Sequence, residues 1–574
     1  MLFEEAAKYY EKLENTSSRL DMVDILSEML THAKPNEIKN LVYLTQGVLA
    51  PPFEGLQIGI AEKFAESAIA MSSGYSKEEV VASFRKTGDL GLTAEEFAKK
   101  GKLKTLSKRH FEADYVFESM HKIAKTSGTG SQDTKIKILV ELLASSSALE
   151  ARYIIRFALG KLRLGAGDAT ILEALSKAFT GDRKSKPELE NAYNICSDLG
   201  KVGEVIGEKG MSGIRHIRVT LFSPIRPALA ERLPTSEQIL EKMNGRCAVE
   251  SKYDGFRVQV HFDRKNNKVA MFSRNLENTT PMFPDIEKAA ISEVSAKEAI
   301  FEGEALAYDE TTGEFRPFQE TIQRKRKHGI AAKSVEFPLH LFSFDLMYLD
   351  GEDYLGRPYE ERRKKLESII KGNGLIRFSD RIIATYTELS SFATMPSSPF
   401  STASSKYLSI CLGVVAIILS DTVDLVILGY FLGKGQRAEF GFGGLLTGVY
   451  NEKKDVFETL SKIGTGFSEE QMRMFNDTLK KIKVSKKPAR VDALVFPDFW
   501  VEPKYVVTVR ADEITRSPMH TCGKGDGKDE TGYALRFPRL VSDGIRKDKG
   551  PEDATTTKEI TEMFDQQKKV RIEG

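Results

Sequence analysis

The spacing of the apolar residues changes once along this chain, near Gly213, and this change restricts the possible folds. From residue 1 to about residue 215, apolar residues recur every three or four positions, as in AAKYYEKLENTSSRLDMVDILSEML and KIKILVELLASSSALEARYIIRFALGKLRL. This period is typical of amphipathic helices. Beyond this point, runs such as FRVQVHF, KVAMFSR and HLFSFDLMYL have the pattern of β-strands. The sequence therefore predicts a helical part followed by parts that contain sheets.

The same pattern predicts three domains. A length of 574 residues suits about three to four folding units. We expect residues 1–215 to form an all-α domain and residues 216–420, where strands mix with helical stretches, to form an α+β domain. In residues 421–574, short strand-like runs separated by Gly- and Pro-containing turns predict a small β-barrel. The segment DATTTKEITEMFDQQKK predicts a closing helix.

Composition excludes several classes of protein. The 84 Lys and Arg residues nearly balance the 82 Asp and Glu residues, so a polyanion would have to be bound by a local cluster of cations. The N-terminus lacks the apolar core of a signal peptide. The longest apolar run, Tyr407–Leu419, is shorter than the ~20 residues of a membrane-spanning helix, so we expect no membrane insertion. Four cysteines without a CxxC pair argue against a zinc knuckle or a disulfide framework and favour the cytoplasm: Cys196, Cys247, Cys411 and Cys522.

The segment ESKYDGFR, from Glu250 to Arg257, is the most informative one for chemistry. Lys252 ends a predicted strand before an Asp-Gly turn, and Arg257 adds a second cation that could reach the same ligand. A lysine whose pKa is lowered by desolvation and neighbouring positive charge can attack phosphorus. The alternative is a solvated surface lysine before a turn.

Further along, three elements could serve the same ligand. In FEGEA, Glu302 and Glu304 alternate so that both carboxylates can lie on one strand face, and Gly303 permits close approach, which is a plausible divalent-metal site. An exposed strand edge is the alternative. The aromatic strand LFSFDLMYLDG could stack a purine or belong to a core. Near the C-terminus, RFPR and RKDK gather cations suited to phosphate oxygens.

The order KYDGFR, SRN, EGE, FDLMYLDG, RFPR and RKDK resembles that of the motifs in ATP-dependent DNA ligases of the archaeal and eukaryotic replicative type, over most of the chain. The helical segments KYYEKLENTSSRLDM and EARYIIRFALGKLRLGAGDATILEAL resemble the DNA-binding domain of that family. This domain distinguishes the family from mRNA capping enzymes and from minimal two-domain ligases. The resemblance implies that the central domain is an adenylation domain and that the barrel is an OB-fold.

The resemblance also implies a mechanism. Lys252 attacks the α-phosphorus of ATP, AMP passes to the 5′-phosphate of a nick, and the 3′-hydroxyl then displaces AMP, with Mg²⁺ required throughout. In the barrel, Arg539, Asp548 and Lys549 would close over ATP during the first step only. Such a scheme requires domain movement.

Around the nucleotide, the resemblance assigns five residues. Glu250 would read the adenine amino group, and Phe344 would stack on adenine. Arg257 and Arg274 would hold the ribose side of the nucleotide. Glu304 would serve both the ribose and the metal.

The expected partner is nicked double-stranded DNA, bound without regard to base sequence. Cations at roughly helical spacing, and the cluster QRKRK, fit phosphate contacts, although basic residues on helices usually form only a solvated face. The family resemblance also favours a sliding clamp as a partner, a monomer, and a cytoplasmic enzyme associated with the nucleoid. The candidate DNA-binding residues are Arg152, Arg156, Lys161, Arg163, Arg324 and Arg326.

One segment departs from the family. A strand with Glu-Gly and a lysine, then an arginine, then a Lys-x-Lys strand should precede LSDTVDLVI, with the two lysines near Ile410 and Leu412. Instead, Ile382 to Gly433 contains one basic and three acidic residues, whereas the average composition gives ~15 charges. A shifted reading frame or a substituted segment would explain the pattern.

Three functions are therefore open at this point. The first is an ATP-dependent DNA ligase that seals nicks in replication, recombination and repair. The second is a catalytically impaired protein of ligase fold that binds nicks, because of the missing Glu-Gly and Lys-x-Lys motifs. The third, an RNA ligase or capping-type nucleotidyltransferase, is disfavoured by the helical N-terminal domain.

Overall fold

The protein forms two compact units in the computed structural model. One contains Met1–Ala228, Gly255–Ala305 and Gln319–Phe378, and the other contains Leu229–Asp254, Leu306–Phe318 and Ser379–Gly574. The structure describes the whole chain except residues 102–109, 229–230, 233–235, 252, 254, 310–313, 317–320, 325–328, 386–406, 411–414, 419–421, 434, 512, 526–530, 542–543 and 568–574.

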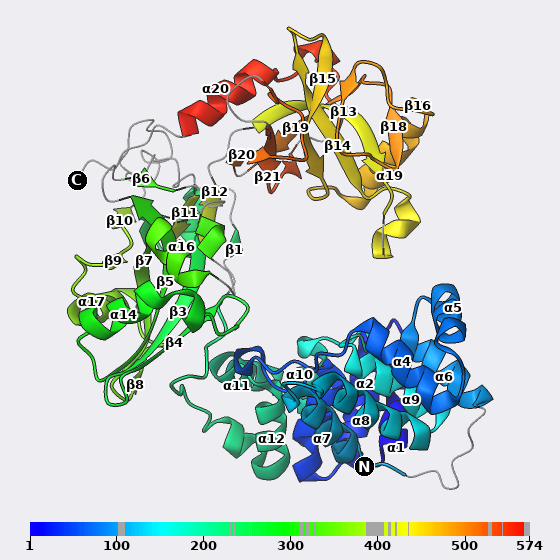
Figure 1. Ribbon diagram of the computed structural model, residues 1–574. Coiled ribbons are helices and arrows are strands. Elements are labelled where there is room, and N and C mark those ends of the chain that lie inside the picture. The colour runs from blue at the N-terminus through cyan, green and yellow to red at the C-terminus, as the bar shows by residue number, and fades with distance from the viewer. Residues whose placement is uncertain are drawn as a thin grey trace. The chain divides into compact units, whose positions relative to one another are not determined.

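The N-terminal part is helical, as predicted (Figure 1). In its first helix, Phe3, Ala6, Tyr10 and Leu13 are all buried, and their spacing places them on one face that packs into a shared core. The helices are α1 (Phe3–Glu14), α2 (Arg19–His32), α3 (Ile38–Gln46), α4 (Glu62–Ser73), α5 (Lys77–Thr87), α6 (Leu90–Lys100), α7 (Ala113–Lys125), α8 (Ser131–Ser145), α9 (Ala148–Ala158), α10 (Asp168–Thr180), α11 (Lys186–Cys196) and α12 (Leu199–Ile214).

Capping boxes fix where two of these helices begin. At the start of α5, Ser76 Oγ accepts a hydrogen bond from the Glu79 backbone N–H, and the Glu79 carboxylate accepts one from the Ser76 N–H. Ser147 and Glu150 repeat the arrangement at the start of α9. Each pair satisfies two backbone N–H groups that a helix end leaves without partners.

A sheet in the first unit is built around strand β3 (Phe256–Asp263). It pairs antiparallel with β4 (Lys268–Ser273) and with β5 (Glu298–Asp309), in the order β4-β3-β5-β7-β8. The other elements are β7 (Leu339–Leu349), β8 (Glu352–Asp353), β9 (Ile376–Phe378), α14 (Pro284–Glu293), α16 (Ile330–Glu336) and α17 (Tyr359–Ile369), and β6 (Glu314–Phe315) pairs with the end of β5.

The second unit contains a smaller sheet that includes the strand before Lys252. That strand, β2 (Arg246–Ser251), lies between β10 (Arg381–Thr385) and β11 (Tyr407–Ile410), both antiparallel to it. The sheet continues with β12 (Val415–Ile418) and β1 (Glu231–Arg232), and α13 (Ser236–Lys242) lies between β1 and β2 in the sequence.

The C-terminal part is rich in sheet. Strand β13 pairs with β14, β18 and β19, and β14 pairs with β15. The elements are β13 (Thr422–Phe431), β14 (Gly444–Asn451), β15 (Val456–Ile463), α19 (Glu469–Lys480), β16 (Lys483–Val484), β17 (Val491–Asp492), β18 (Phe499–Val501), β19 (Val506–Arg510), β20 (Glu513–Ser517), β21 (Gly532–Arg536), β22 (Arg539–Leu540) and α20 (Thr557–Gln567).

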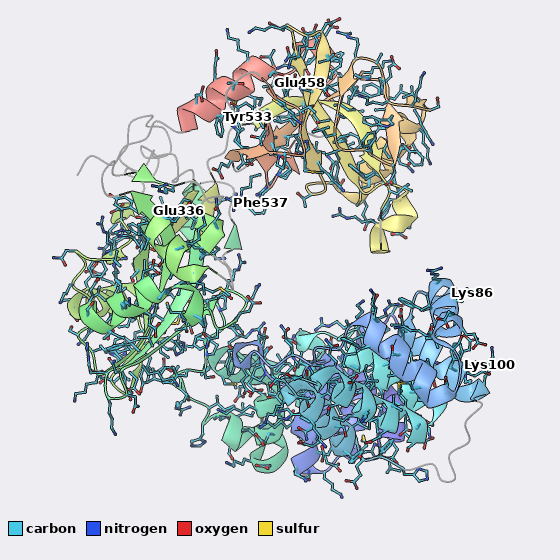
Figure 2. All side chains as sticks on the ribbon, in the orientation of Figure 1. Lys86, Lys100, Glu336, Glu458, Tyr533 and Phe537 are labelled. Atoms are coloured by element: carbon cyan, nitrogen blue, oxygen red, sulfur yellow. The ribbon has the colours of Figure 1, made fainter. Side chains whose placement is uncertain are left out.

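A buried carboxylate ties the closing helix α20 to this sheet. Glu458 on β15, labelled in Figure 2, has no exposed surface. Four groups donate hydrogen bonds to it, so its charge is compensated inside the domain. They are Asn451 Nδ2 at 2.9 Å, Lys454 Nζ at 3.0 Å, the Gly523 N–H at 2.9 Å and Thr557 Oγ1 at 2.9 Å.

These observations confirm the predicted fold class: a helical N-terminal part, a mixed α/β centre and a sheet-rich C-terminal part with a closing helix. The predicted boundaries at residues 215 and 420 do not coincide with the division into two compact units, because the strands of the central part are shared between them. Within the part of the chain that the structure describes, no helix combines the length and apolar character that a membrane crossing needs.

Candidate active site

One face of β3 carries three polar residues at alternate positions. Arg257, Gln259 and His261 share this face because successive side chains of a strand point to opposite sides. In the pairing with β5, Arg257 lies opposite Glu304, and Gln259 lies opposite Glu302. The two strands therefore bring two carboxylates beside a guanidinium and an amide. Sequence reasoning missed Gln259 and His261, although the alternation in FRVQVHF was a signal for them.

Arg257 is held by Glu302 and by an aromatic ring. Its Nε donates to Glu302 Oε2 at 3.1 Å, and its Nη2 donates to the same oxygen. The guanidinium carbon lies 5.6 Å from the centroid of the Phe344 ring. Burial disfavours the charged form of Arg257, but the charge of Glu302 outweighs this effect and raises the pKa of the guanidinium. The site thus keeps a fixed cation.

Glu304 anchors the turn that follows Lys252 in the sequence. Its Oε1 accepts a hydrogen bond from the Gly255 N–H at 3.1 Å. The neighbouring Gly303 is required for close packing, since an added Cβ would lie 2.8 Å from Leu341 Cδ1 and 2.8 Å from the Phe342 carbonyl oxygen. This contact supports the interpretation of Gly303 as a close-approach position.

The two carboxylates of the EGE motif are not equivalent, which corrects the expectation that both could serve a metal. Glu302 is 2% exposed. Its oxygens are occupied by Arg257 and by Gln259 Nε2, which donates at 3.0 Å. Glu304 is half-buried and is the carboxylate of the pair that a cation could reach. In the described ranges, no group of three or more His, Cys, Asp or Glu side chains could hold a metal ion.

In the second unit, Glu250, two residues before Lys252, and Tyr253, directly after it, are buried and hydrogen-bonded, while Lys252 itself lies outside the described residues. Glu250 is 3% exposed, and its Oε1 accepts a hydrogen bond from Ser379 Oγ at 3.1 Å. The Tyr253 hydroxyl donates to Asp380 Oδ2 at 3.2 Å, and burial raises the pKa of Tyr253. The backbone before Lys252 is therefore firmly placed.

The segment that departs from the family lies beside the same strand. Ser409 of β11 is opposite Glu250, and Ile410 is opposite Val249. Neither β11, which reads YLSI, nor β12, which reads VAII, contains a charged residue. Of the two positions where Lys-x-Lys is expected, Ile410 ends β11, and Leu412 lies outside the described residues.

Arg274 and Arg539 have different settings. Arg274 is exposed in the turn after β4, where a ligand could reach it. Arg539 lies in β22, opposite Arg510 of β19, and is half-buried. Phe537, labelled in Figure 2, precedes it with an exposed ring and a φ of 49°.

Two of the three cations of RKDK, Arg546 and Lys549, are paired with carboxylates within the C-terminal part. Lys549 Nζ donates to Asp424 Oδ2 at 2.6 Å, and Arg546 Nη1 donates to Asp424 Oδ1 at 3.4 Å. Arg546 also donates to Asp548 through Nε at 2.7 Å, and this hydrogen bond lowers the pKa of Asp548 to about 2. Any phosphate bound by Lys549 would have to replace Asp424 as its partner.

In the helical part, the structure corrects the prediction for Arg156. Its side chain is 3% exposed and donates to Glu14 Oε2 at 2.8 Å and to Asp89 Oδ2 at 2.9 Å. Burial tends to raise the pKa of both carboxyls, but the hydrogen bonds from Arg156 outweigh it and lower both. Arg152, at 12% exposure, pairs likewise with Glu95 and Glu14. Both arginines hold helices together rather than face solvent.

Two further candidate DNA-binding residues, Arg163 and Arg324, differ in how much of their side chains is exposed. Arg163 has 54% of its side chain exposed, although it lies 3.2 Å from Asp89. Arg324, at 1% exposure, is paired with Asp285 at 2.7 Å, so the structure places it in the interior and corrects that prediction too. Arg326 lies outside the described residues.

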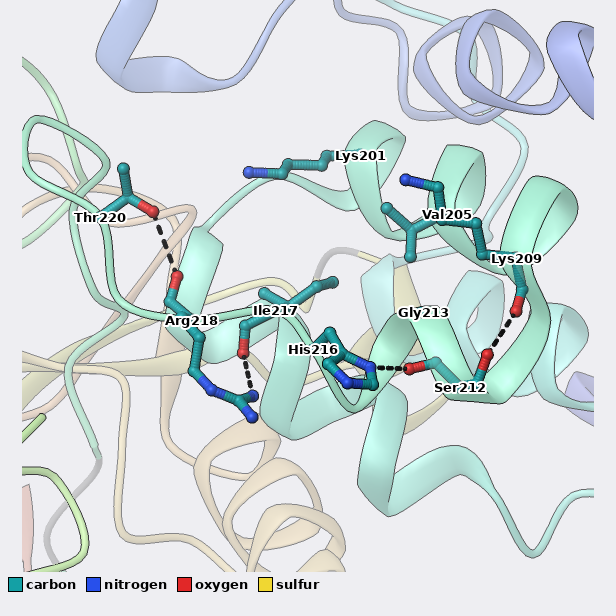
Figure 3. A pocket seen from close by; sticks show the side chains of 9 residues that line it. All are labelled: Lys201, Val205, Lys209, Ser212, Gly213, His216, Ile217, Arg218 and Thr220. Atoms are coloured by element: carbon teal, nitrogen blue, oxygen red, sulfur yellow. Dashed lines mark hydrogen bonds between the residues drawn. The ribbon is translucent and has the colours of Figure 1, made fainter.

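A basic pocket of about 720 Å³ lies along α12 and the segment after it (Figure 3). None of its lining residues is acidic, and in the described structure no carboxylate pairs with Lys201, Lys209 or Arg218. The Arg218 guanidinium donates to two backbone carbonyls, at 2.6 and 3.1 Å. Sequence reasoning missed this pocket, although Lys201, Val205 and Lys209 recur at helical spacing on α12. The full lining is Lys201, Val205, Lys209, Ser212, Gly213, His216, Ile217, Arg218 and Thr220.

Comparison with known proteins identifies the class. Three family models match consecutive parts of the chain: "DNA ligase N terminus" over residues 2–176, "ATP dependent DNA ligase domain" over residues 227–395, and "ATP dependent DNA ligase C terminal region" over residues 438–549. The chain belongs to the ATP-dependent DNA ligases.

Relatives of known name match over the whole length. A "Probable DNA ligase" of Dictyoglomus thermophilum is 44% identical over 589 residues, covering 100% of this chain and 99% of that protein. A "DNA ligase" of Saccharolobus solfataricus is 40% identical over 602 residues, with the same coverage. A solved structure titled "Pmar-Lig_PreS3" has a similar fold, with a TM-score of 0.52 at 16% identity over 94% of this chain and 98% of that one.

The protein is thus an ATP-dependent DNA ligase, an enzyme that seals nicks in DNA. None of these comparisons favours the impaired nick-binding alternative. Membership of this family explains why the motifs from KYDGFR to RKDK occur in the order that ATP-dependent DNA ligases have.

The buried and the exposed class of arginine can be separated by experiment. Replacement of Arg156 by Gln should lower the free energy of unfolding by about 3 kcal/mol, because the buried Asp89 would lose the buried arginine that it pairs with and Glu14 would lose one of its two arginine partners. Replacement of the exposed Arg163 by Gln should change it by less than about 0.5 kcal/mol. Urea unfolding followed by helical circular dichroism measures both. Equal stability of the two variants would contradict the structural role of Arg156.

Acid should lower the stability of the folded protein through His261 on β3. Burial lowers the pKa of His261 from 6.5 to about 3, so the unfolded chain binds a proton that the folded protein excludes. The contribution of neutral His261 to the free energy of unfolding is fully present above about pH 6.5, and it is lost as the pH falls toward 3. At about pH 5 the loss is about 2 kcal/mol, from 1.36 kcal/mol per pH unit. Urea unfolding at about pH 6.5 and at about pH 5 measures this loss of unfolding free energy. A His261→Gln variant should lose less than the unaltered protein, and an equal loss would refute the role of His261.

Proposed function

We propose that Lys252 is the nucleophile of this ligase and that the Arg257 cluster on β3 holds the nucleotide. The Lys252 Nζ forms a bond to the α-phosphorus of ATP while the bond to the β-phosphate oxygen breaks and pyrophosphate leaves. An oxygen of the 5′-phosphate at the nick then takes AMP from the lysine. Finally the 3′-hydroxyl attacks that 5′-phosphorus, the phosphodiester forms, and AMP leaves.

The observation that carries this proposal is the fixed cation on β3, which follows the lysine segment closely in the sequence. Gly255, three residues after Lys252, is tied to Glu304, and Arg257 follows two residues later with its guanidinium held by Glu302 and Phe344. A preorganised side chain binds its ligand without having to be ordered during the reaction. On the other side of Lys252 in the sequence, Glu250 is buried and fixed by Ser379.

The remaining nucleotide contacts are proposed from the chemistry and exposure of each residue. Glu250 is an acceptor suited to the adenine amino group, and the Phe344 ring is suited to stacking on the base. The exposed Arg274 can reach the ribose side. Arg539, Asp548 and Lys549 would act in the first step only, after Lys549 exchanges Asp424 for a phosphate oxygen.

Mg²⁺ fits Glu304 as its single protein carboxylate. The EGE motif offers Glu304, because Glu302 is engaged by Arg257 and Gln259. Magnesium is commonly held by one or two carboxylates together with substrate phosphates, so one carboxylate suffices. When bound, the ion would neutralise charge on the phosphate oxygens. Glu304 would hold it, while its second role is to keep the Gly255 turn in place.

For DNA, we propose that the basic pocket along α12 and the exposed Arg163 contact backbone phosphates. Lys201, Lys209 and Arg218 line a concave surface with no acidic residue, which suits a polyanion (Figure 3). Phosphate contacts carry no base preference, as sealing any nick requires. The family resemblance also supports a sliding clamp as a partner, a monomeric enzyme, and action in the cytoplasm on nucleoid DNA.

The nucleophile is tested by label transfer. Purified protein incubated with α-labelled ATP and Mg²⁺ should become labelled on a denaturing gel, because AMP stays on Lys252. A Lys252→Ala variant should lose the label. A Lys265→Ala variant, changed at an exposed lysine in the turn after β3, should keep it. Label on the Lys252→Ala variant would refute the assignment.

The DNA contacts are tested by salt dependence. Replacing Lys201 and Lys209 by Gln should weaken binding to nicked duplexes of any sequence and reduce the slope of log K against log[salt] by about 2, since two phosphate contacts are lost. Lys8 and Lys12 on α1 provide a matched control pair, whose replacement by Gln should leave the slope unchanged. Fluorescence anisotropy measures this slope, and an equal change in both double variants would contradict the proposal.

A further inference from the structure

The segment after α12, residues 219–226, is fixed to β3 at one end of the polar face that carries Arg257. Val219 and Ile225 are buried against Ile300 of β5 and Met347 of β7. On its other side the segment is held by α11, since Ser223 Oγ donates to the Cys196 carbonyl at 2.8 Å. We call residues 219–226 the connector. It joins the helical part to the sheet that carries the proposed nucleotide site.

Two buried side chains of β3 form hydrogen bonds with the backbone of the connector. The Phe222 N–H donates to His261 Nδ1 at 2.9 Å. The Ile225 N–H donates to Gln259 Oε1 at 2.8 Å, and Gln259 Nε2 donates to the Ile225 carbonyl at 3.0 Å. His261 and Gln259 are 0% and 3% exposed, so water does not replace these partners. Two side chains of β3 thus form the hydrogen bonds with the connector backbone that a neighbouring strand would otherwise form.

The donors and acceptors in this network allow a single arrangement of protons. A backbone N–H can only donate, so His261 Nδ1 accepts and the ring proton is on Nε2. That Nε2–H donates to Gln259 Oε1 at 2.9 Å. The Gln259 amide is oriented by Ile225, which both donates to it and accepts from it. The second proton of Gln259 Nε2 therefore points at Glu302 Oε1, 3.0 Å away.

Glu302 continues the network to Arg257. One of its oxygens accepts from Gln259 and the other accepts from Arg257 Nε at 3.1 Å. The carboxylate is 2% exposed, and its orientation is set by these two neighbours. The hydrogen bonds thus run without a gap from the connector backbone, through His261, Gln259 and Glu302, to the guanidinium.

Phe222 shows that the connector is held in a specific conformation. Its φ of 67° lies in the left-handed region, which is unfavourable for a residue with a side chain. Its ring lies 6.3 Å from the His261 ring, and Lys268 Nζ lies 4.0 Å from the Phe222 ring centroid. The hydrogen bond to His261 and these ring contacts offset the backbone strain.

We propose that Gln259 and His261 are positioning residues, which orient Glu302 so that it holds Arg257 toward the nucleotide and which make this orientation depend on the docked connector. The inference rests on the proposed role of Arg257 in nucleotide binding. If the connector leaves β3, Gln259 loses both bonds to Ile225 and is free to rotate away from Glu302. The affinity for ATP then depends on a segment that does not touch ATP.

A double-mutant cycle tests the proposal, with the initial rate of self-adenylation as the readout. Replacing Gln259 by Met keeps the length of the side chain but removes its hydrogen bonds. We expect the KM for ATP to rise about tenfold, with a smaller change in kcat. In an Arg257→Ala background, the same replacement should raise KM less than about twofold, because the residue through which Gln259 acts is absent.

A matched control separates positioning from stability. Val260 lies between Gln259 and His261, is fully buried and faces the other side of β3. Replacing Val260 by Ala should lower the melting temperature without raising KM for ATP. His261→Phe provides a second variant of the network, in case Gln259→Met does not fold. Its KM should rise, and this rise should also disappear in the Arg257→Ala background.

The outcomes distinguish the inference from the proposed function. If Arg257→Ala alone leaves KM unchanged, the proposed nucleotide-binding role of Arg257 is wrong. If Arg257→Ala raises KM but neither Gln259→Met nor His261→Phe does, positioning by the network is wrong while the role of Arg257 stands. If the network variants raise KM by the same factor with and without Arg257, they act by another route and the inference is overturned.

Discussion

The register between β3 and β5 is the constraint on which the rest of the site depends. It places Arg257 opposite Glu304 and Gln259 opposite Glu302, and a shift of one residue would turn all of these side chains to the other face. Hydrophobic residues on the opposite face, such as Val258 and Val260, are buried and so fix that register. Core packing and site chemistry are therefore specified by the same strand pairing.

Burial decides which charged residues serve the fold and which remain available for ligands. Arg156, Arg324 and Glu302 are nearly inaccessible and have partners of opposite charge, because an unpaired buried charge is costly. Glu304, Arg274, Arg163 and the cations of the α12 pocket retain exposed surface. Because the net charge is only +2, a polyanion such as DNA would have to be bound by local clusters of exposed cations.

Much of the fold could be predicted from the sequence, because periodicity and turn residues act locally. The helical run to residue 215, the strands FRVQVHF and HLFSFDLMYL and the closing helix all follow from such patterns. The fate of individual charges could not be predicted, since the partners of Arg156 are 67 and 142 residues away along the chain. The roles proposed for Lys252, Arg257 and their neighbours came from the order of the motifs, and they remain proposals.

The central claim is that AMP is transferred through Lys252 and that the nucleotide is held by the cation that the β3–β5 pair fixes. The most direct measurement is peptide mapping by mass spectrometry of the protein after incubation with ATP and Mg²⁺, with acid avoided because a bond between nitrogen and phosphorus is labile in acid. The account predicts AMP on the peptide that contains Lys252. AMP on a different lysine, or no adduct in a protein that still seals nicks with ATP, would contradict it.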